Sequence, residues 1–233
     1  MTLLRSNIEY KQTHLTILAS ICLEKKALLE LIANYGLLER YIQGNPLFLS
    51  SYEPVPVEKD APFIVKSMAD AGEKAGVGPM ATVAGAFSDL IGSFFLANGA
   101  EEVIVENGGD VFLKITEPRK IGVYAGPSKF SERIGFEVMP KETPLGVCTS
   151  SDSVGPSISL GKGDAVTAFA STSALADAAA TAIGNDVKGE KAIESGIKKA
   201  KSIKGVRGVL IVKGDEMGVW GSVPSLIKTP NTK

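Results

Sequence analysis

The sequence predicts an α+β fold in which mixed or antiparallel sheets pack with helices, as two similar halves around a shared cleft. Residues 13–19 alternate between apolar and polar side chains, as a strand does, and residues 22–43 then carry apolar side chains at helical spacing. Twice along the chain, a small-residue helix bearing an aspartate is followed by a hairpin pattern, first in 80–113 and again in 174–221. With 233 residues, 44% of them hydrophobic, the chain is long enough to bury a sizeable core.

We expect a single domain at 1–223, with halves of about 1–145 and 146–223, and a loose tail at 224–233. The tail has only Leu226 and Ile227 as large apolar residues, and two prolines interrupt it.

Composition restricts the partners and the location. A net charge of −1 without a basic stripe argues against a nucleic-acid surface, and the lysines of 190–204 read as the solvated face of an amphipathic helix. Cys22 and Cys148 lack metal-ligand spacing, which favours a reducing compartment. Ile21 stands where a lipid-anchoring signal needs a small residue, so we expect a cytoplasmic protein. The apolar stretches 81–100 and 165–184 each contain an aspartate, and we expect no membrane span.

The first half continues with two helices and a hairpin. Residues 44–62 contain four prolines and are expected to form a surface connection, followed by a helix at 62–75. A second helix begins near Pro79 and ends at Asn98-Gly99, with Gly85 and Asp89 on one face.

The expected strands 102–106 and 111–115 flank the turn Asn107-Gly108-Gly109-Asp110. This turn is either an ordinary hairpin turn or one stripped of side chains so that a ligand can approach its backbone. Gly76, Gly78 and Ala81 match a loose dinucleotide-binding pattern, but the residues before them are helical, which argues against that function.

Asp177 is the residue of the second half that most needs an explanation. It lies in a helix expected at 174–183, with hydroxyl caps at 171–173 and a stop at Gly184-Asn185. Thr181 follows four residues later, roughly 40° away in azimuth and about 6 Å along the axis, so the two side chains converge. A carboxylate and a hydroxyl suit Mg²⁺. Alternatively, Asp177 caps a neighbouring loop or pairs with a lysine, and the surrounding alanines permit tight helix packing.

Four segments in the same order carry a resemblance to a known family: AGAFSD at 84–89, ENGGD at 106–110, CTSS at 148–151 and ALADAAATAI at 174–183. Together they resemble the ApbE-like FAD:protein FMN transferases over about 77–184, and the chain is closest to the uncharacterised branch without a signal peptide. The resemblance implies an ApbE-like fold and a flavin-nucleotide site.

The resemblance also implies roles for particular residues. It places Mg²⁺ on Asp177 and Thr181, which would be the catalytic pair, and FAD as substrate or ligand. It places the flavin nucleotide against Gly85, Asp89, Asn107, Gly108, Gly109, Asp110, Thr149, Ser150 and Ser151. Ala84 replaces a lysine of the transferases, Ser151 replaces a glycine, and 156–159 replaces their histidine motif.

Three functional classes stay open. The first is a Mg²⁺-dependent enzyme that moves FMN from FAD to a hydroxyl of an acceptor protein, or cleaves a related pyrophosphate. The second is a non-catalytic flavin or nucleotide carrier, and the third is a thiol enzyme that uses Cys148. A histidine-based triad would need His14, the sole histidine of the chain. An oligomer is compatible with all three classes.

Overall fold

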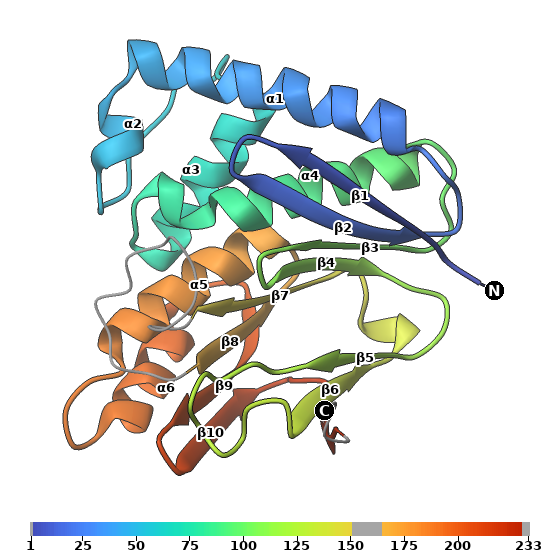
Figure 1. Ribbon diagram of the computed structural model, residues 1–233. Coiled ribbons are helices and arrows are strands. Elements are labelled where there is room, and N and C mark those ends of the chain that lie inside the picture. Colours follow the sequence, from blue (N-terminus) through green and yellow to red (C-terminus); the bar gives the residue numbers. More distant parts are fainter. Residues whose placement is uncertain (1, 151–164, 230–233) are drawn as a thin grey trace.

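The computed structural model describes residues 2–150 and 165–229 (Figure 1). Its helices are α1 (Glu24–Gly44), α2 (Leu47–Ser50), α3 (Phe63–Ala75), α4 (Val83–Ala97), α5 (Ser173–Asp186) and α6 (Ala192–Ser202), with short 3-10 turns at Pro79–Thr82 and Pro140–Glu142. Its strands are β1 (Leu4–Tyr10), β2 (Thr13–Ala19), β3 (Val103–Asn107), β4 (Asp110–Lys114), β5 (Arg119–Gly122), β6 (Ile134–Val138), β7 (Leu145–Ser150), β8 (Ala165–Ala170), β9 (Val206–Lys213), β10 (Glu216–Gly221) and β11 (Ser225–Lys228).

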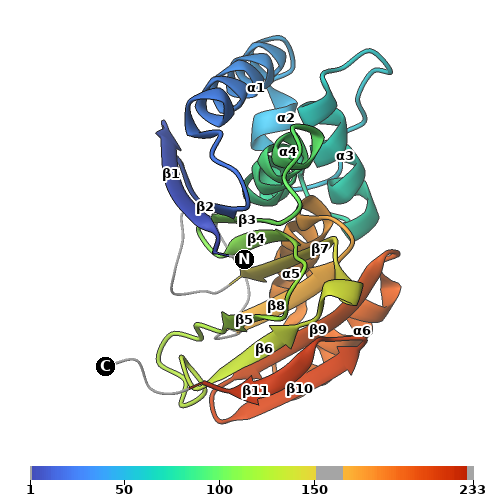
Figure 2. The same cartoon turned by 90° about the vertical axis from the view of Figure 1, so that its right-hand side faces the viewer.

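A large antiparallel sheet organises the molecule. Its eight strands lie in the order β1-β2-β3-β4-β7-β8-β9-β10, and every neighbouring pair is antiparallel. A smaller sheet, β11-β6-β5, packs against one face of β4, β7, β8 and β9 (Figure 2). The α+β class with antiparallel sheets and packed helices is therefore confirmed.

Alternation along the central strands divides the core into two layers. Cys148, Val166 and Ala168 face the helices and join the larger core, whereas Val147 and Phe169 face the small sheet. The ring of Phe169 meets that of Phe136 on β6 edge to face, with centroids 4.8 Å apart. The large sheet thus separates a helical side from a small-sheet side, and side chains of adjacent residues lie on opposite sides of it.

The locally encoded elements agree with the sequence. Strand β2 lies at the expected residues, and α1, α3 and α6 lie close to their expected positions. Thr172 caps α5 by accepting a hydrogen bond from the backbone N–H of Leu175. The helix runs on through Gly184 to Asp186, however, so the expected stop at Gly184-Asn185 is two residues early.

Three segments differ from expectation. The sequence does not predict strand β1, because Ile8 is its only buried residue. The strand forms through backbone pairing with β2 rather than through burial of its side chains. The connection 44–62 contains the one-turn helix α2, which the fully buried Phe48 anchors to the core. The expected loose tail instead forms β11 at Ser225–Lys228, because backbone pairing with β6 needs no large apolar side chains.

One stretch, Pro79–Ala97, has the length and composition of a membrane-crossing helix, with a mean hydropathy of 1.5. In the structure it comprises the 3-10 turn and α4, which packs against α5, β3 and β4. The buried apolar side chains of α4 are part of the hydrophobic core.

Helices α4 and α5 cross at backbone contact distance. A Cβ added to Gly85 of α4 would lie 2.3 Å from the carbonyl oxygen of Ser173 at the start of α5. Gly146 of β7 is equally confined, since its Cβ would lie 2.4 Å from the carbonyl oxygen of Thr172. Only glycine permits the start of α5 to lie against both elements.

We expect Gly85→Ala to destabilise the fold. Alanine improves helix propensity by about 1 kcal/mol, but the added methyl group meets backbone that cannot rotate away, and overpacking of this kind costs about 1–3 kcal/mol or more. Urea denaturation would measure the loss. Gly44→Ala is the matched control, because a Cβ there meets nothing within 4 Å. Equal stabilities of the two variants would contradict the account of the crossing.

Candidate functional site

At the crossing, each helix is capped by a carboxylate of the other helix. Asp89 of α4 accepts hydrogen bonds from the first backbone N–H groups of α5, those of Ser173 at 2.7 Å and Ala174 at 2.9 Å. Asp177 of α5 accepts one at 3.0 Å from the backbone N–H of Gly85, in the first turn of α4. Amide groups of a first helical turn have no partners within their own helix, and the helix dipole favours negative charge there.

The two caps are not equivalent. Both oxygens of Asp89 are engaged by α5, whereas Asp177 makes its hydrogen bond through Oδ2 and has a weaker backbone interaction with Ala84. Thr181 stands one helical turn beyond Asp177 on the same face of α5. Asp177 is therefore the cap with capacity for a further partner. The sequence left open that Asp177 caps a neighbouring element instead of binding a metal, and the hydrogen bond from Gly85 shows that Asp177 does form such a cap.

A third carboxylate, Asp110, lies close to Asp177 at the start of β4. Ser88 of α4 donates to the carbonyl oxygen of Asp110 at 2.9 Å, which ties the hairpin to the helix. All three carboxylates are largely enclosed, yet each retains some accessible surface. They form what we call the carboxylate cluster: Asp89, Asp110 and Asp177.

Burial and mutual repulsion make ionisation of the carboxylate cluster unfavourable. Burial raises the pKa of Asp177 well above its ordinary value, and the nearby charges of Asp110 and Asp89 raise it further, against the backbone N–H groups. Burial likewise raises the pKa of Asp110 to about 7 and that of Asp89 to about 6. Among residues 2–150 and 165–229, no lysine or arginine acts on these carboxyls, so no cationic side chain in this part of the chain offsets their repulsion.

Cys148 lies beneath the carboxylate cluster. Its side chain is fully buried, and its Sγ donates to the carbonyl oxygen of Ser173 at 3.2 Å. Burial raises the pKa of the thiol well above its ordinary value, and Asp110 and Asp177 raise it further. A neutral, enclosed thiol is a poor nucleophile, so the geometry argues against the thiol-enzyme hypothesis.

The hairpin turn joins β3 to β4 beside the cluster. Gly108 and Gly109 have φ values of 63° and 103°, which suits a two-residue hairpin turn. Asn107 donates from its side chain to the carbonyl oxygen of Ala84 at 3.1 Å, so the turn is fixed to the start of α4. A Cβ at Gly108 would meet nothing within 4 Å. The turn is thus both an ordinary hairpin and an open backbone surface.

On the other side of the large sheet, a cavity of about 390 Å³ opens between the two sheets. Gly108, Gly109 and Thr149 contribute to its wall, together with β5 and β6. The Thr149 and Thr167 hydroxyls form a hydrogen bond of 2.9 Å across β7 and β8. The hairpin turn therefore borders both the cavity and the edge of the sheet near the cluster.

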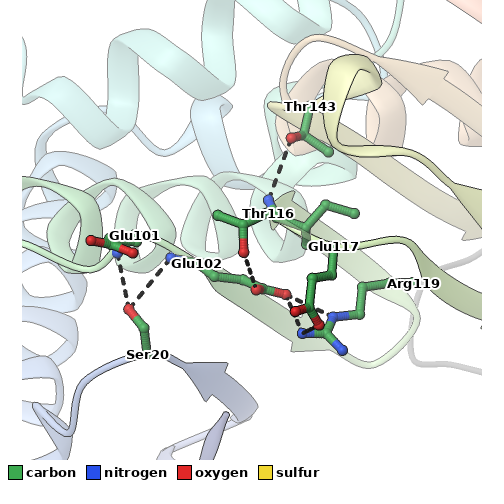
Figure 3. Close-up of polar contacts among 8 residues, drawn as sticks. Ser20, Glu101, Glu102, Thr116, Glu117, Arg119 and Thr143 are labelled. Carbon is green, nitrogen blue, oxygen red and sulfur yellow. Dashed lines mark hydrogen bonds and ion pairs between the residues drawn. The ribbon is translucent and has the colours of Figure 1, made fainter. Parts of the chain in front are cut away.

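A buried ion pair anchors the small sheet that covers this cavity (Figure 3). Glu102, only 1% exposed, accepts a hydrogen bond of 2.7 Å from Nε of Arg119, and Nη2 of Arg119 lies 2.6 Å from the same oxygen. Thr116 donates to the other oxygen at 2.8 Å. Since Arg119 is the first residue of β5, the pair ties the small sheet to the start of β3.

The structure brings together most of the residues that the sequence nominates. Gly85, Asp89, Asp110 and Asp177 meet on the helical side, and Asn107 contacts the start of α4. By alternation, Ser150 faces the helical side, whereas its neighbour Thr149 lines the cavity. Ser151 and the segment 156–159 lie outside the described residues.

Sequence reasoning missed three features of this region. Glu106 and Thr167 also line the cavity, and Glu102 pairs with Arg119. The alternation of Glu106 with Val103 and Val105 could have indicated that Glu106 faces away from the helices. Nothing local could have paired Glu102 with Arg119. Across the described ranges 2–150 and 165–229, no three His, Cys, Asp or Glu side chains are arranged to hold a metal ion together.

The architecture defines the class: the chain has an ApbE-like fold. It resembles the flavin transferase ApbE from Vibrio cholerae with a TM-score of 0.62 at 16% identity, over 94% of this chain and 97% of that one. It resembles the ApbE protein of Thermotoga maritima with a TM-score of 0.57 at 15% identity, over 93% and 96%.

Sequence comparison then gives the particular family. Residues 2–205 match the family model described as AbpE bacteria, and the chain belongs to that family. A UPF0280 protein of Methanocaldococcus jannaschii is 48% identical over 211 residues, covering 88% of this chain and 85% of the relative. A UPF0280 protein of Methanosarcina barkeri is 38% identical over 227 residues, covering 97% and 89%.

We expect Arg119→Ala to cost about 3 kcal/mol of unfolding free energy, because it leaves Glu102 buried without a counter-charge. Chemical denaturation measures this. Lys74→Ala is the control: its exposed partner Asp70 lies in an i,i+4 pair, and such pairs contribute about 0.3–0.5 kcal/mol. A loss for Arg119→Ala no larger than that of the control would contradict the anchoring role.

The carboxylate cluster predicts that stability falls as pH rises from about 4 to 7. A carboxyl whose pKa is raised on folding binds more protons in the folded than in the unfolded state. For Asp110, the loss of stability caused by ionisation is therefore absent below its unfolded pKa of 3.8 and complete above its folded pKa of about 7. Asp110→Asn, which keeps an acceptor oxygen, should remove part of this slope and raise stability at pH 8, by about 1.4 kcal/mol for each pKa unit relieved. Denaturation of both proteins at pH 5 and pH 8 tests this, and parallel pH profiles would contradict it.

Proposed function

We propose that this protein binds a flavin nucleotide in a Mg²⁺-dependent manner, and that it transfers FMN from FAD to a hydroxyl of an acceptor protein or cleaves a related pyrophosphate. The observation that carries the proposal is the carboxylate cluster at the first turn of α4, where burial and then Asp110 raise the pKa of Asp177 and no lysine or arginine of the described residues offsets the charge. Family membership supports it, as does the shared fold of proteins described as flavin transferases.

The donor set fits Mg²⁺. Asp177 offers a carboxylate with spare capacity, and Thr181 adds a hydroxyl on the same face of α5. Mg²⁺ in proteins takes one or two carboxylates and completes its octahedral shell with water and substrate phosphate, so a larger protein cluster is not needed. Bound there, Mg²⁺ would offset the repulsion within the cluster and neutralise charge on the pyrophosphate oxygens.

The chain's own residues would position the reacting groups. The amide groups at the first turn of α4 favour anionic ligands, and the open backbone of Gly108 and Gly109 permits a close approach. In FMN transfer, the acceptor oxygen bonds to the FMN phosphorus, the bond from that phosphorus to AMP breaks, and the acceptor's proton leaves to solvent. The nucleophile therefore belongs to the acceptor protein.

The alternative is a flavin or nucleotide carrier that keeps the cleft without catalysis. Ala84, in place of the lysine that the transferases carry, favours it. A cytoplasmic location and the absence of nucleic-acid or membrane partners remain predictions for either function, and either is compatible with an oligomer.

Titration calorimetry with FAD, with and without Mg²⁺, followed by analysis of the recovered nucleotide, tests the proposal. We expect Mg²⁺-dependent binding that Asp177→Asn and Thr181→Val each weaken about tenfold or more, since each removes a metal ligand. Asp177→Asn keeps an acceptor for Gly85, and Thr181→Val keeps the side-chain shape. Release of AMP with an acceptor would identify the transferase, and binding without turnover the carrier.

Ser93→Ala is the matched control. Ser93 is exposed and lies four residues after Asp89 on α4, so it repeats the spacing of Asp177 and Thr181 beside a carboxylate that is already engaged. We expect Ser93→Ala to bind FAD as the wild type does. FAD binding that does not depend on Mg²⁺ and is unchanged in Asp177→Asn and Thr181→Val, or no FAD binding at all, would overturn the proposal.

A further inference from the structure

Strand β1 forms one outer edge of the large sheet (Figure 1 and Figure 2). It pairs with β2 along all seven of its residues, and it contains neither proline nor glycine. Proteins often blunt their edge strands with prolines, bulges or short lengths, because an unpaired strand edge recruits another strand. The other edge strands are less suited to pairing, since β10 contains Gly218 and Gly221 and both β5 and β11 are four residues long. Strand β1 is therefore the edge best suited to pair with another chain.

The backbone groups that β1 offers to a partner belong to Arg5, Asn7 and Glu9. Tyr10 and Thr13 flank a two-residue turn and pair with each other, so they exchange backbone hydrogen bonds. Such pairs alternate along an antiparallel ladder, which turns the N–H and C=O groups of every second residue away from β2. The side chains of Arg5, Asn7 and Glu9 are exposed and lie on one face of the sheet.

One register of a β1–β1 pair matches opposite charges. When two copies of β1 run antiparallel with Asn7 opposite Asn7, Arg5 of each copy lies opposite Glu9 of the other. All of these residues turn their backbone groups outward, so the same register completes the ladder hydrogen bonds. The two neighbouring registers with this hydrogen-bonding pattern would place Arg5 opposite Asn7 or Lys11 instead. Opposite charges directly across a strand pair are stabilising and like charges are destabilising, which favours the register centred on Asn7.

The same register also covers an exposed apolar side chain. Leu4 is 49% exposed, and in this register it would lie opposite Tyr10 of the other copy. Tyr10 already packs against the large core. Residues of a non-hydrogen-bonded pair approach to about 4.5 Å between their Cα atoms, so the side chains of Leu4 and Tyr10 would be in contact. The charged face and the helical face of β1 therefore favour the same arrangement.

We propose that two copies of this chain associate through antiparallel pairing of their β1 strands, which joins the two large sheets into one continuous sheet. The two-fold axis passes through the pair of Asn7 residues, whose amide side chains can donate to and accept from each other. An isologous contact of this kind occupies the same edge on both copies, and so the assembly closes at a dimer. The carboxylate cluster is not part of the contact, and the dimer is therefore independent of the proposed function.

Sedimentation equilibrium of the full chain over a range of concentrations tests the dimer. We expect a dimer for the wild type, and a dimer Kd that is about tenfold higher or more for Arg5→Glu and for Glu9→Arg. Each of these variants replaces two attractive pairs with two repulsive ones, because the contact is symmetric. The double variant Arg5→Glu/Glu9→Arg restores opposite charges in the same register and should recover the dimer. Glu216→Arg, the same charge reversal at an exposed residue of the opposite edge strand β10, is the matched control and should behave as the wild type does.

Asn7→Pro tests the backbone pairing. Because the N–H of Asn7 points away from β2, proline removes no ladder hydrogen bond within one chain, whereas it removes one at the centre of the dimer contact. We expect a monomer whose circular dichroism spectrum matches that of the wild type. A monomeric wild type, an assembly larger than two chains, or a dimer that the β1 variants leave unchanged would overturn the proposal. Failure of the double variant to recover the dimer would overturn it as well.

Discussion

The reciprocal capping of α4 and α5 is the interaction on which the rest of this structure depends. Each helix begins against the other, each carries an aspartate that accepts hydrogen bonds from the other's first turn, and Gly85 leaves room for the crossing. Removal of either carboxylate would leave helical N–H groups without a protein acceptor. This arrangement also concentrates negative charge at one point, and so the fold itself creates the place where a cation would be stabilised.

The protein treats its buried charges in two different ways. Glu102 is compensated by Arg119 and Thr116, as a structural charge should be, and the pair holds the small sheet in place. Among the residues that the structure describes, no cationic side chain acts on Asp110 or Asp177, and burial together with repulsion from neighbouring carboxylates raises the pKa of both. Strongly perturbed carboxyls beside an open turn are typical of functional sites, where affinity for a ligand is kept at the expense of stability.

The large sheet separates two chemical environments, and the β3–β4 hairpin connects them at one edge. The helical side offers carboxylates and helix amides, whereas the small-sheet side offers apolar walls, two hydroxyls and Glu106. Neighbouring residues such as Thr149 and Ser150 thereby face different environments.

Local sequence signals determined much of the fold. Cap residues and small side chains defined α5, the Asn-Gly-Gly-Asp turn defined the β3–β4 hairpin, and apolar periodicity defined α1 and β2. Motif order also nominated Asp89, Asp110 and Asp177 as site residues. Tertiary structure alone decided what these carboxylates contact, which charges are paired, and which strands form without apolar patterns, as in β1 and β11. The reason is that capping across helices, ion pairing and strand pairing each join residues far apart in sequence, and no local pattern specifies the partner.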